Sequence, residues 1–286
     1  MNVPKSIETR TFATSNGANL IVEDFGGIGD NLIFVHAAGY CARMYLPIAT
    51  ALRDRFHCWG FNARFHGGST GGDTLEPNWE TLASDLRMVT EAISPRPWSG
   101  FGHSYGATGL LLAEQHVPGT FESLYAYEPV FHLSGTPGNP NHGNRLSQIT
   151  RKRRATFSTR SEAAANFSSK APMSSFNPLV VDLYLETGVT RGLDQALHLS
   201  CPPDVEAEIY AWSFAHTVLA DMPKVRSKVL IMAGAKTEAF SVGHLDKLTP
   251  ECQDAQLRHA YALGHFGPFA SPNQLAQVVL DFEERT

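Results

Sequence analysis

The chain has 286 residues, which is enough for one large domain or two small ones. Hydrophobic residues make up 43% of the sequence and charged residues 18%, a composition typical of globular proteins and not of disordered ones. Its 23 basic and 28 acidic side chains give a formal net charge of -5, so the electrostatics do not favour a nucleic-acid partner. We interpret the one basic run, residues 151–154, as a solvated helix face.

Several other classes of protein are disfavoured by what the sequence lacks. The N-terminal residues do not combine a basic segment with an apolar one, and no apolar stretch reaches the ~18 residues of a membrane-spanning helix, so we expect neither a signal peptide nor a membrane partner. Cys41, Cys58, Cys201 and Cys252 are widely spaced, which predicts free thiols and a cytoplasmic location. The histidines lack metal-ligand spacing, so we expect no metal and no cofactor. The oligomeric state is left open, with a homodimer as one option.

Strands and helices alternate along the first part of the chain. Residues 11–25 contain a turn signal, Ser15-Asn16-Gly17, and predict a hairpin. Further short apolar runs predict strands, and runs with apolar spacings of three and four predict helices. In chain order we expect a strand at 31–35, a helix at 44–52, a strand at 56–61, a helix at 79–93, a strand at 98–101, a helix at 105–116 and a strand at 121–127.

The pattern changes in the middle of the chain, which has helix-like runs such as residues 205–218 and no convincing strand. After it we expect two more strands and a closing helix, at residues 228–232, 257–262 and 273–282. Alternating strands and helices indicate an α/β fold, with a parallel sheet covered by helices on both faces. We therefore interpret residues 130–222 as a helical cap inserted into a core domain made of residues 1–129 and 223–286.

The motif that carries the most chemistry is Gly102-His103-Ser104-Tyr105-Gly106. It follows an apolar run and precedes a helix-like one, as a nucleophile elbow requires. Such a turn is so tight that only glycine-sized residues fit two positions either side of the serine, and the helix points its first amides at the group that the serine attacks. The pattern makes Ser104 a candidate nucleophile and the chain a candidate hydrolase or acyl transferase.

A serine nucleophile needs a base and an oxyanion hole, and in a parallel sheet both are expected at the carboxyl ends of strands. His265 follows the last strand in a glycine-flanked loop and is the candidate base. The segment His36-Ala37-Ala38-Gly39 follows an earlier strand, and its small residues let the backbone approach a substrate. We expect the amides of Ala38, or Ala37, and of Tyr105 to form the oxyanion hole.

Two glutamates compete for the acid that would orient His265. Glu128 ends the strand at 121–127, and Glu238 follows the strand at 228–232, so both lie at carboxyl ends of strands. Their positions alone do not separate them.

With these motifs the chain resembles the α/β-hydrolase superfamily over nearly its whole length. Residues 36–39 resemble the family's HGxG oxyanion loop, and residues 62–69 resemble its D-x-R-G-H-G-x-S motif. The elbow and the G-H-F-x-P-like loop at residues 264–268 complete the set in the family's order. The resemblance implies a mostly parallel, eight-stranded, doubly wound sheet with an inserted helical cap. Ala37 and Phe65 depart from the glycines that are usual at their positions.

The resemblance also bears on the acid. Most members carry a catalytic aspartate at the position of Thr237. Some members, including haloalkane dehalogenases and zearalenone-type lactonases, take the acid from the end of the preceding strand, 24 residues after the nucleophile, where this chain has Glu128. Residues 233–240 also resemble the lactonase subgroup. We therefore expect a triad of Ser104, His265 and Glu128, with Glu238 as the alternative acid.

These residues predict a serine hydrolase that cleaves a carboxylic ester or lactone bond through an acyl-enzyme. A serine nucleophile disfavours dehalogenase chemistry, which needs a carboxylate. Carbon–carbon bond hydrolysis, perhydrolysis and a non-catalytic receptor for a small ligand are alternatives, since one fold serves many functions. Aromatic residues in the cap predict a small hydrophobic substrate. The candidate substrate contacts are His36, Tyr40, His103, Trp212 and Phe266, although His36 is expected mainly to hold its loop.

Overall fold

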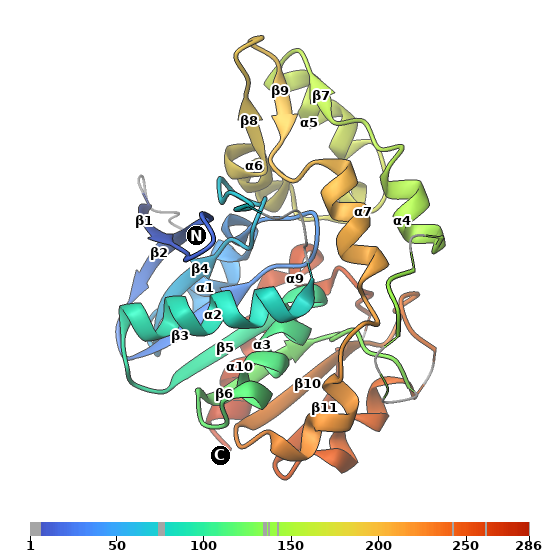
Figure 1. Ribbon diagram of the computed structural model, residues 1–286. Coiled ribbons are helices and arrows are strands. Elements are labelled where there is room, and N and C mark those ends of the chain that lie inside the picture. Colours follow the sequence, from blue (N-terminus) through green and yellow to red (C-terminus); the bar gives the residue numbers. More distant parts are fainter. Residues whose placement is uncertain are drawn as a thin grey trace.

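The computed structural model describes residues 7–73, 78–133, 136, 138–141, 143–241, 243–260 and 262–285. Its centre is an eight-stranded sheet in the order β1-β2-β4-β3-β5-β6-β10-β11 (Figure 1). The strands are β1 (Glu8–Ala13), β2 (Asn19–Gly27), β3 (Asp30–Val35), β4 (Phe56–Phe61), β5 (Trp98–His103), β6 (Phe121–Tyr127), β10 (Lys228–Gly234) and β11 (Ala255–Ala260). In this sheet β2 pairs antiparallel with β1 and β4, and the other pairs are parallel. The expected mostly parallel, eight-stranded sheet is confirmed.

Helices cover both faces of the sheet. Helices α1 (Leu46–Leu52) and α10 (Pro272–Glu283) pack on one face, and α2 (Trp79–Ile93) and α3 (Tyr105–His116) pack on the other (Figure 1). In β3, Leu32 and Phe34 belong to the first apolar cluster, whereas Ile33 and Val35 belong to the second. Successive side chains of a strand point to opposite faces, so a strand covered on both faces must be apolar throughout. Shorter helical elements are η1 (Ala42–Tyr45), η2 (Met173–Ser175), η3 (Met222–Lys224), η4 (Leu245–Lys247), η5 (Thr249–Glu251) and α9 (Gly267–Ala270).

The residues between β6 and β10 form an insertion, most of which lies above or to the right of the sheet in the view of Figure 1. Its helices are α4 (Arg145–Thr150), α5 (Arg160–Ser168), α6 (Pro178–Thr187), α7 (Pro203–Ala211) and α8 (Val218–Asp221). The expectation of no strand here is wrong, because a small antiparallel sheet joins β7 (Thr156–Phe157), β9 (Leu197–Leu199) and β8 (Val189–Arg191). Runs of two or three residues are too short to show an alternating pattern. The single helix expected over residues 205–218 is divided into α7 and α8. Residues 130 and 222 stay predicted bounds of the cap.

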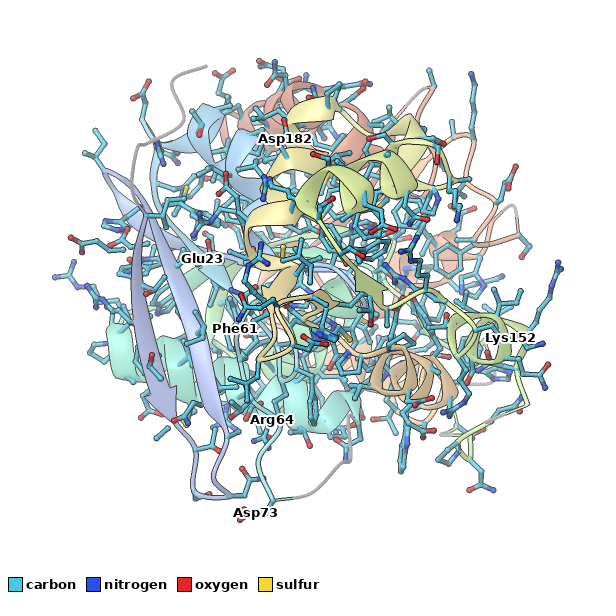
Figure 2. All side chains as sticks on the ribbon, turned by 90° about the horizontal axis from the view of Figure 1, so that it is seen from above. Glu23, Phe61, Arg64, Asp73, Lys152 and Asp182 are labelled. Atoms are coloured by element: carbon cyan, nitrogen blue, oxygen red, sulfur yellow. The ribbon has the colours of Figure 1, made fainter. Side chains whose placement is uncertain are left out.

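The basic run at residues 151–154 lies mostly on the surface of the insertion and forms ion pairs within it. Its three arginines pair with acidic side chains of the same insertion: Arg151 with Asp204 and Glu208, Arg153 with Glu206, and Arg154 with Glu162. Figure 2 shows Lys152 on the outer side of the insertion, where it is exposed. Three of the four side chains are exposed, as a solvated face requires, but the run follows α4 and is not part of a helix face, and its arginines connect this segment to α7 and α5.

The cysteines are isolated from one another in the fold. All four are free and buried, which confirms the prediction of free thiols. Burial raises the pKa of the Cys41 and Cys58 thiols to about 12, so both stay protonated at neutral pH. Among the helices that the structure describes, none is long and apolar enough to cross a bilayer.

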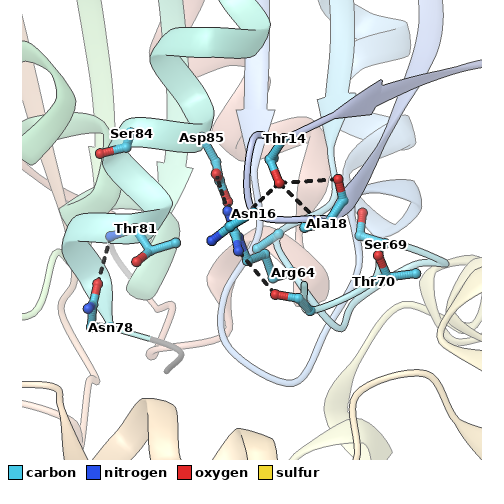
Figure 3. Close-up of polar contacts among 12 residues, drawn as sticks. Thr14, Asn16, Ala18, Arg64, Ser69, Thr70, Asn78, Thr81, Ser84 and Asp85 are labelled. Atoms are coloured by element: carbon cyan, nitrogen blue, oxygen red, sulfur yellow. Dashed lines mark hydrogen bonds and ion pairs between the residues drawn. The ribbon is translucent and has the colours of Figure 1, made fainter. Parts of the chain in front are cut away.

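A buried ion pair fixes the loop after β4 against α2. Arg64 donates from Nε to Asp85 Oδ2 at 2.7 Å and from Nη2 to Asp85 Oδ1 at 2.9 Å, and its Nη1 donates to the Gly71 carbonyl oxygen at 3.0 Å (Figure 3). The two side chains are only 11% and 6% exposed. A charge this deeply buried is stable only while it is paired. The pair therefore fixes the first part of the loop after β4 against α2.

Two buried histidines join the loops that follow β3 and β4. His36 accepts a hydrogen bond from the Ala63 amide at 3.0 Å, and His66 accepts one from the Gly39 amide at 3.0 Å. The two rings lie 4.6 Å apart and are fully buried. Each accepting nitrogen faces an N–H, so both rings must be neutral, and burial lowers the pKa of both, that of His66 to about 4. These reciprocal bonds fix the loop of residues 36–39.

Replacing Asp85 by Asn is expected to lower the free energy of unfolding by about 3 kcal/mol or more, because Arg64 keeps a buried charge and loses its counter-ion. Urea unfolding followed by circular dichroism measures the change. The matched control is Asp204→Asn, which removes an acid that is 81% exposed beside Arg151. That substitution should change the free energy by less than about 1 kcal/mol. Equal effects of the two substitutions would contradict a particular role for the buried pair.

The neutral histidines predict a loss of stability in acid. The pKa of His66 is about 4 in the folded protein and about 6.5 in an unfolded chain, so its contribution is complete above the higher value and declines as the pH falls toward the lower one. At about pH 5 the loss from His66 alone is about 2 kcal/mol. The free energy of unfolding of His66→Gln should therefore decline less between neutral and acid pH than that of the wild type. A wild-type decline in His66→Gln would refute this origin.

Candidate active site

Ser104 stands at the sharp turn between β5 and α3. Its backbone has φ 54° and ψ -113°, a region that residues with a side chain rarely adopt. Glycines flank it because there is no room for a side chain: a Cβ on Gly102 would lie 2.4 Å from Ala107 Cα, and one on Gly106 would lie 2.2 Å from the Val35 carbonyl oxygen. This geometry is that of a nucleophile elbow, and it places Ser104 on the wall of a cavity.

Glu128 follows β6 and is fully buried. It also has a positive φ, 47°, and its amide donates to the Met232 carbonyl oxygen at 2.9 Å. Its Oε1 accepts from the Gly234 amide at 2.7 Å, and its Oε2 accepts from the Thr237 hydroxyl at 2.8 Å and from His265 Nδ1 at 2.6 Å. A buried carboxylate requires such donors to offset its lost hydration. The bonds tie the end of β6 to β10 and to the loop that carries His265.

The ring of His265 has a defined orientation. Because Nδ1 donates to the glutamate, the neutral ring carries its proton there and Nε2 is left as an acceptor. The backbone of the loop is held by two side chains: the Tyr127 hydroxyl donates to the Gly264 carbonyl oxygen at 2.6 Å, and His103 Nε2 donates to the His265 carbonyl oxygen at 2.8 Å. His265 and Ser104 line the same cavity. The structure therefore brings an oriented imidazole and the serine of the elbow to one site.

The two candidate acids occupy different environments. Glu238 is exposed on the cavity wall, and among the hydrogen bonds of the described residues none joins it to His265. Glu128 makes that bond from a buried position. Thr237, at the position where the family usually has an aspartate, donates to Glu128. The presence of a threonine where an aspartate is usual is the sequence feature that could have identified Thr237 as part of the site.

Two backbone amides on the cavity wall are suited to bind an oxyanion. Tyr105 is the first residue of α3, and the first amides of a helix have no acceptor within the helix. Ala38 lines the same cavity. The Ala37 amide is already engaged, because it donates to the Tyr45 hydroxyl at 3.2 Å. The arrangement favours the pair Ala38 and Tyr105 over Ala37.

The cavity has a volume of about 830 Å³, which is the size of a small-molecule site. Its wall is largely apolar, with contributions from Tyr40, Trp79, Val130, Tyr210, Phe214, Phe240, Leu263 and Phe266. Three exposed charged side chains also line it: Arg145, Lys236 and Glu238. Tyr40 and Phe266 thus lie where the sequence analysis expects substrate contacts. Trp79 also lines the cavity, although its position at the start of a periodic helix predicts only a core residue.

Three of the expected substrate contacts lie elsewhere. His36 is fully buried, and both its ring nitrogens bond to the backbone. His103 is fully buried too, with Nδ1 bound to Tyr45 and Nε2 bound to the His265 carbonyl oxygen. Rings whose nitrogens are satisfied by the protein are not available to a ligand. Trp212 packs against the apolar cluster on the face of α2 and α3, outside the described cavity wall.

A metal site would need several side-chain ligands grouped together among the described residues. Among them, no three His, Cys, Asp or Glu side chains are grouped as ligands of an ion would be. The histidines closest to the elbow, His36, His103 and His265, each use ring nitrogens in bonds to the protein itself.

Comparison with solved structures places the fold among hydrolases. E-2-(acetamidomethylene)succinate hydrolase has a TM-score of 0.81 at 19% identity, over 98% of this chain and 100% of the other. A thioesterase domain from the curacin biosynthetic pathway has a TM-score of 0.77 at 13% identity, over 96% and 100%. An esterase from a marine microorganism has a TM-score of 0.73 at 20% identity, over 92% and 98%. At such identities the likeness shows the fold alone. No curated protein sequence matches the chain significantly.

The sequence itself shows the family. Residues 32–278 match a family profile described as the alpha/beta hydrolase family, which is most of the chain, from β3 into α10. The matched part contains the elbow, the loop of residues 36–39 and the loop of His265. The chain therefore belongs to the α/β-hydrolase family.

Proposed function

We propose that the protein is a serine hydrolase that cleaves a carboxylic ester or lactone bond of a small hydrophobic molecule. The observation that carries the proposal is the orientation of His265: its Nδ1 is bound to the buried Glu128 carboxylate, and it lines the same cavity as Ser104. An imidazole oriented in this way near an elbow serine suits nucleophilic acyl transfer. The family, and the esterase and thioesterase among its structural neighbours, support a hydrolase.

In the first step, His265 Nε2 takes the Ser104 proton as Oγ attacks the carbonyl carbon. Negative charge moves onto the carbonyl oxygen, where the amides of Ala38 and Tyr105 donate to it. Glu128 keeps the ring in place and stabilises the imidazolium. The intermediate then collapses, the bond to the leaving oxygen breaks, and that oxygen takes the proton from His265.

In the second step, water attacks the carbonyl carbon of the acyl-enzyme and gives a proton to His265. Collapse breaks the bond to Ser104 Oγ, which takes that proton back. An ester yields an acid and an alcohol. A lactone yields one hydroxy acid, because its leaving oxygen stays attached to the acyl group.

The insertion supplies part of the wall that would meet the substrate. Leu146, Tyr210 and Phe214, from residues 130–222, line the cavity together with Trp79 of the core. Apolar walls favour a hydrophobic acyl or ring group, whose burial contributes roughly 25 cal/mol per Å². We therefore assign the insertion the role of a cap that selects the substrate. The free thiols favour a reducing compartment, and we place the reaction in the cytoplasm.

Ser104→Ala and His265→Ala should each lower kcat for p-nitrophenyl ester hydrolysis by roughly 10⁴-fold or more, because each removes a member of one catalytic unit. Ser213→Ala is the matched control, since it truncates another serine of the cavity wall. It should change kcat by less than about tenfold. Near-wild-type kcat in either triad variant would refute the assignment.

A fluorophosphonate should label the wild type at Ser104 and leave Ser104→Ala unlabelled, because only an activated serine reacts. An unlabelled wild type would favour a ligand receptor instead. A substrate panel of esters, lactones and vinylogous diketones separates ester hydrolysis from carbon–carbon bond hydrolysis.

The triad acid can be tested by moving it. Glu128→Ala should lower kcat by roughly 10³-fold or more, because His265 loses the group that orients its ring, whereas Glu238→Ala should cost less than about tenfold. Thr237 Oγ1 lies 2.8 Å from Glu128 Oε2, so an aspartate there would return a carboxylate to the site. We expect Glu128→Ala/Thr237→Asp to recover roughly tenfold or more of the lost kcat. A larger loss in Glu238→Ala than in Glu128→Ala would make Glu238 the acid.

A further inference from the structure

A series of buried hydrogen bonds runs from the oxyanion loop to the backbone of His265. The Ala37 amide donates to the Tyr45 hydroxyl at 3.2 Å, the hydroxyl lies 2.8 Å from His103 Nδ1, and His103 Nε2 lies 2.8 Å from the His265 carbonyl oxygen. Tyr45 and His103 are fully buried. Neither belongs to the described cavity wall, so neither is placed to touch a substrate.

The bonds of this series all run in one direction. The His265 carbonyl oxygen can only accept, so His103 Nε2 carries a proton. Burial, together with His265, lowers the pKa of His103, so the ring is neutral and its Nδ1 accepts from the Tyr45 hydroxyl. The hydroxyl oxygen in turn accepts from the Ala37 amide. The Tyr45 hydroxyl thus has a partner on each side, and loss of any member of the series leaves a buried polar atom unpaired.

We propose that Tyr45 and His103 are positioning residues that hold the oxyanion loop and the loop of the base in register. One end of the series is next to Ala38, whose amide would bind the oxyanion, and the other end is the backbone of His265. The inference rests on the proposed function, in which both groups must meet one carbonyl group. A displacement of about 1 Å at a reacting centre costs on the order of 100-fold in rate.

The packing around Tyr45 allows its hydroxyl to be tested by itself. Its ring centroid lies within a set of aromatic neighbours, at 5.0 Å from Phe269, 6.1 Å from Phe101 and 6.3 Å from Phe34. Phenylalanine would keep these contacts and would remove only the hydrogen-bonding group.

Tyr125 provides the matched control. It is a fully buried tyrosine of β6 whose hydroxyl donates to Glu283 at 2.6 Å, and it is not part of the described cavity wall. Tyr125→Phe therefore removes a buried hydroxyl of the same kind, without a link to the oxyanion loop or to His265. The comparison separates a general loss of stability from a loss of positioning.

The experiment measures kcat and KM for p-nitrophenyl ester hydrolysis, and urea unfolding, for both variants. Both should lose stability to a similar extent. Tyr45→Phe should lower kcat roughly 10- to 100-fold with KM changed less than about threefold, and Tyr125→Phe should leave kcat within about twofold. A wild-type kcat in Tyr45→Phe, or an equal loss of kcat in Tyr125→Phe, would overturn the proposal.

Variants of His103 test whether the bonds act as one unit. His103→Gln offers a carbonyl oxygen to Tyr45 and an N–H to His265, so it should keep most of the kcat that His103→Leu loses. The double variant Tyr45→Phe/His103→Leu should lose no more kcat than His103→Leu alone, because the series is already broken. Losses that multiply in the double variant would overturn the coupling.

Failure of this inference can be told from failure of the proposed function. If the wild type hydrolyses esters and Ser104→Ala does not, the proposed function stands, and a normal kcat in Tyr45→Phe overturns the coupling alone. If the wild type neither hydrolyses the panel nor reacts with the fluorophosphonate, both are overturned.

Discussion

The buried carboxylate of Glu128 is the constraint on which the rest of the site depends. A charge inside a protein costs several kcal/mol unless donors surround it. Here the donors are the Gly234 amide, the Thr237 hydroxyl and His265 Nδ1, which come from the end of β10 and from the loop after β11. The sheet order places β6, β10 and β11 side by side. The need of one buried carboxylate for donors thus holds three neighbouring chain segments in a single arrangement, and that arrangement fixes the ring of His265.

Strained backbone conformations occur at the carboxyl ends of β5 and β6, and hydrogen bonds to the neighbouring strands offset the strain. Ser104 and Glu128 have φ 54° and 47°, and Phe65, where the related motif has glycine, has φ 65°. The Ser104 amide donates to the Tyr127 carbonyl oxygen at 2.8 Å, and the Glu128 amide donates to the Met232 carbonyl oxygen at 2.9 Å. Ser104 and Glu128 are therefore each bound to the next strand of the sheet. Such conformations persist where the surroundings over-determine them.

The sequence predicts most of the sheet and its helices because each of these elements has an apolar pattern that extends over several consecutive residues. Residues 56–61 and 79–93 coincide with β4 and α2, since a buried strand is continuously apolar and a packed helix repeats every three or four residues. The strands of the insertion are too short for either signal. In the site, the two glycines that flank Ser104 can be recognised from five neighbouring residues. The hydrogen-bond partners of a histidine in a loop, by contrast, depend on the tertiary fold. His36 and His103 stand next to the elbow and its loop, yet their rings point into hydrogen bonds that only the tertiary fold creates.

Thr237 explains how the site works with a carboxylate on β6. The resemblance to the family places an acid at the end of β10, and a second carboxylate there would lie next to Glu128, since Thr237 Oγ1 is 2.8 Å from Glu128 Oε2. Two like charges so close would force one of them to take up a proton. A hydroxyl instead donates a hydrogen bond and adds no charge. Because β6 and β10 are adjacent and Thr237 contacts Glu128, a carboxylate fits at one of these two strand ends only while the other position adds no second charge.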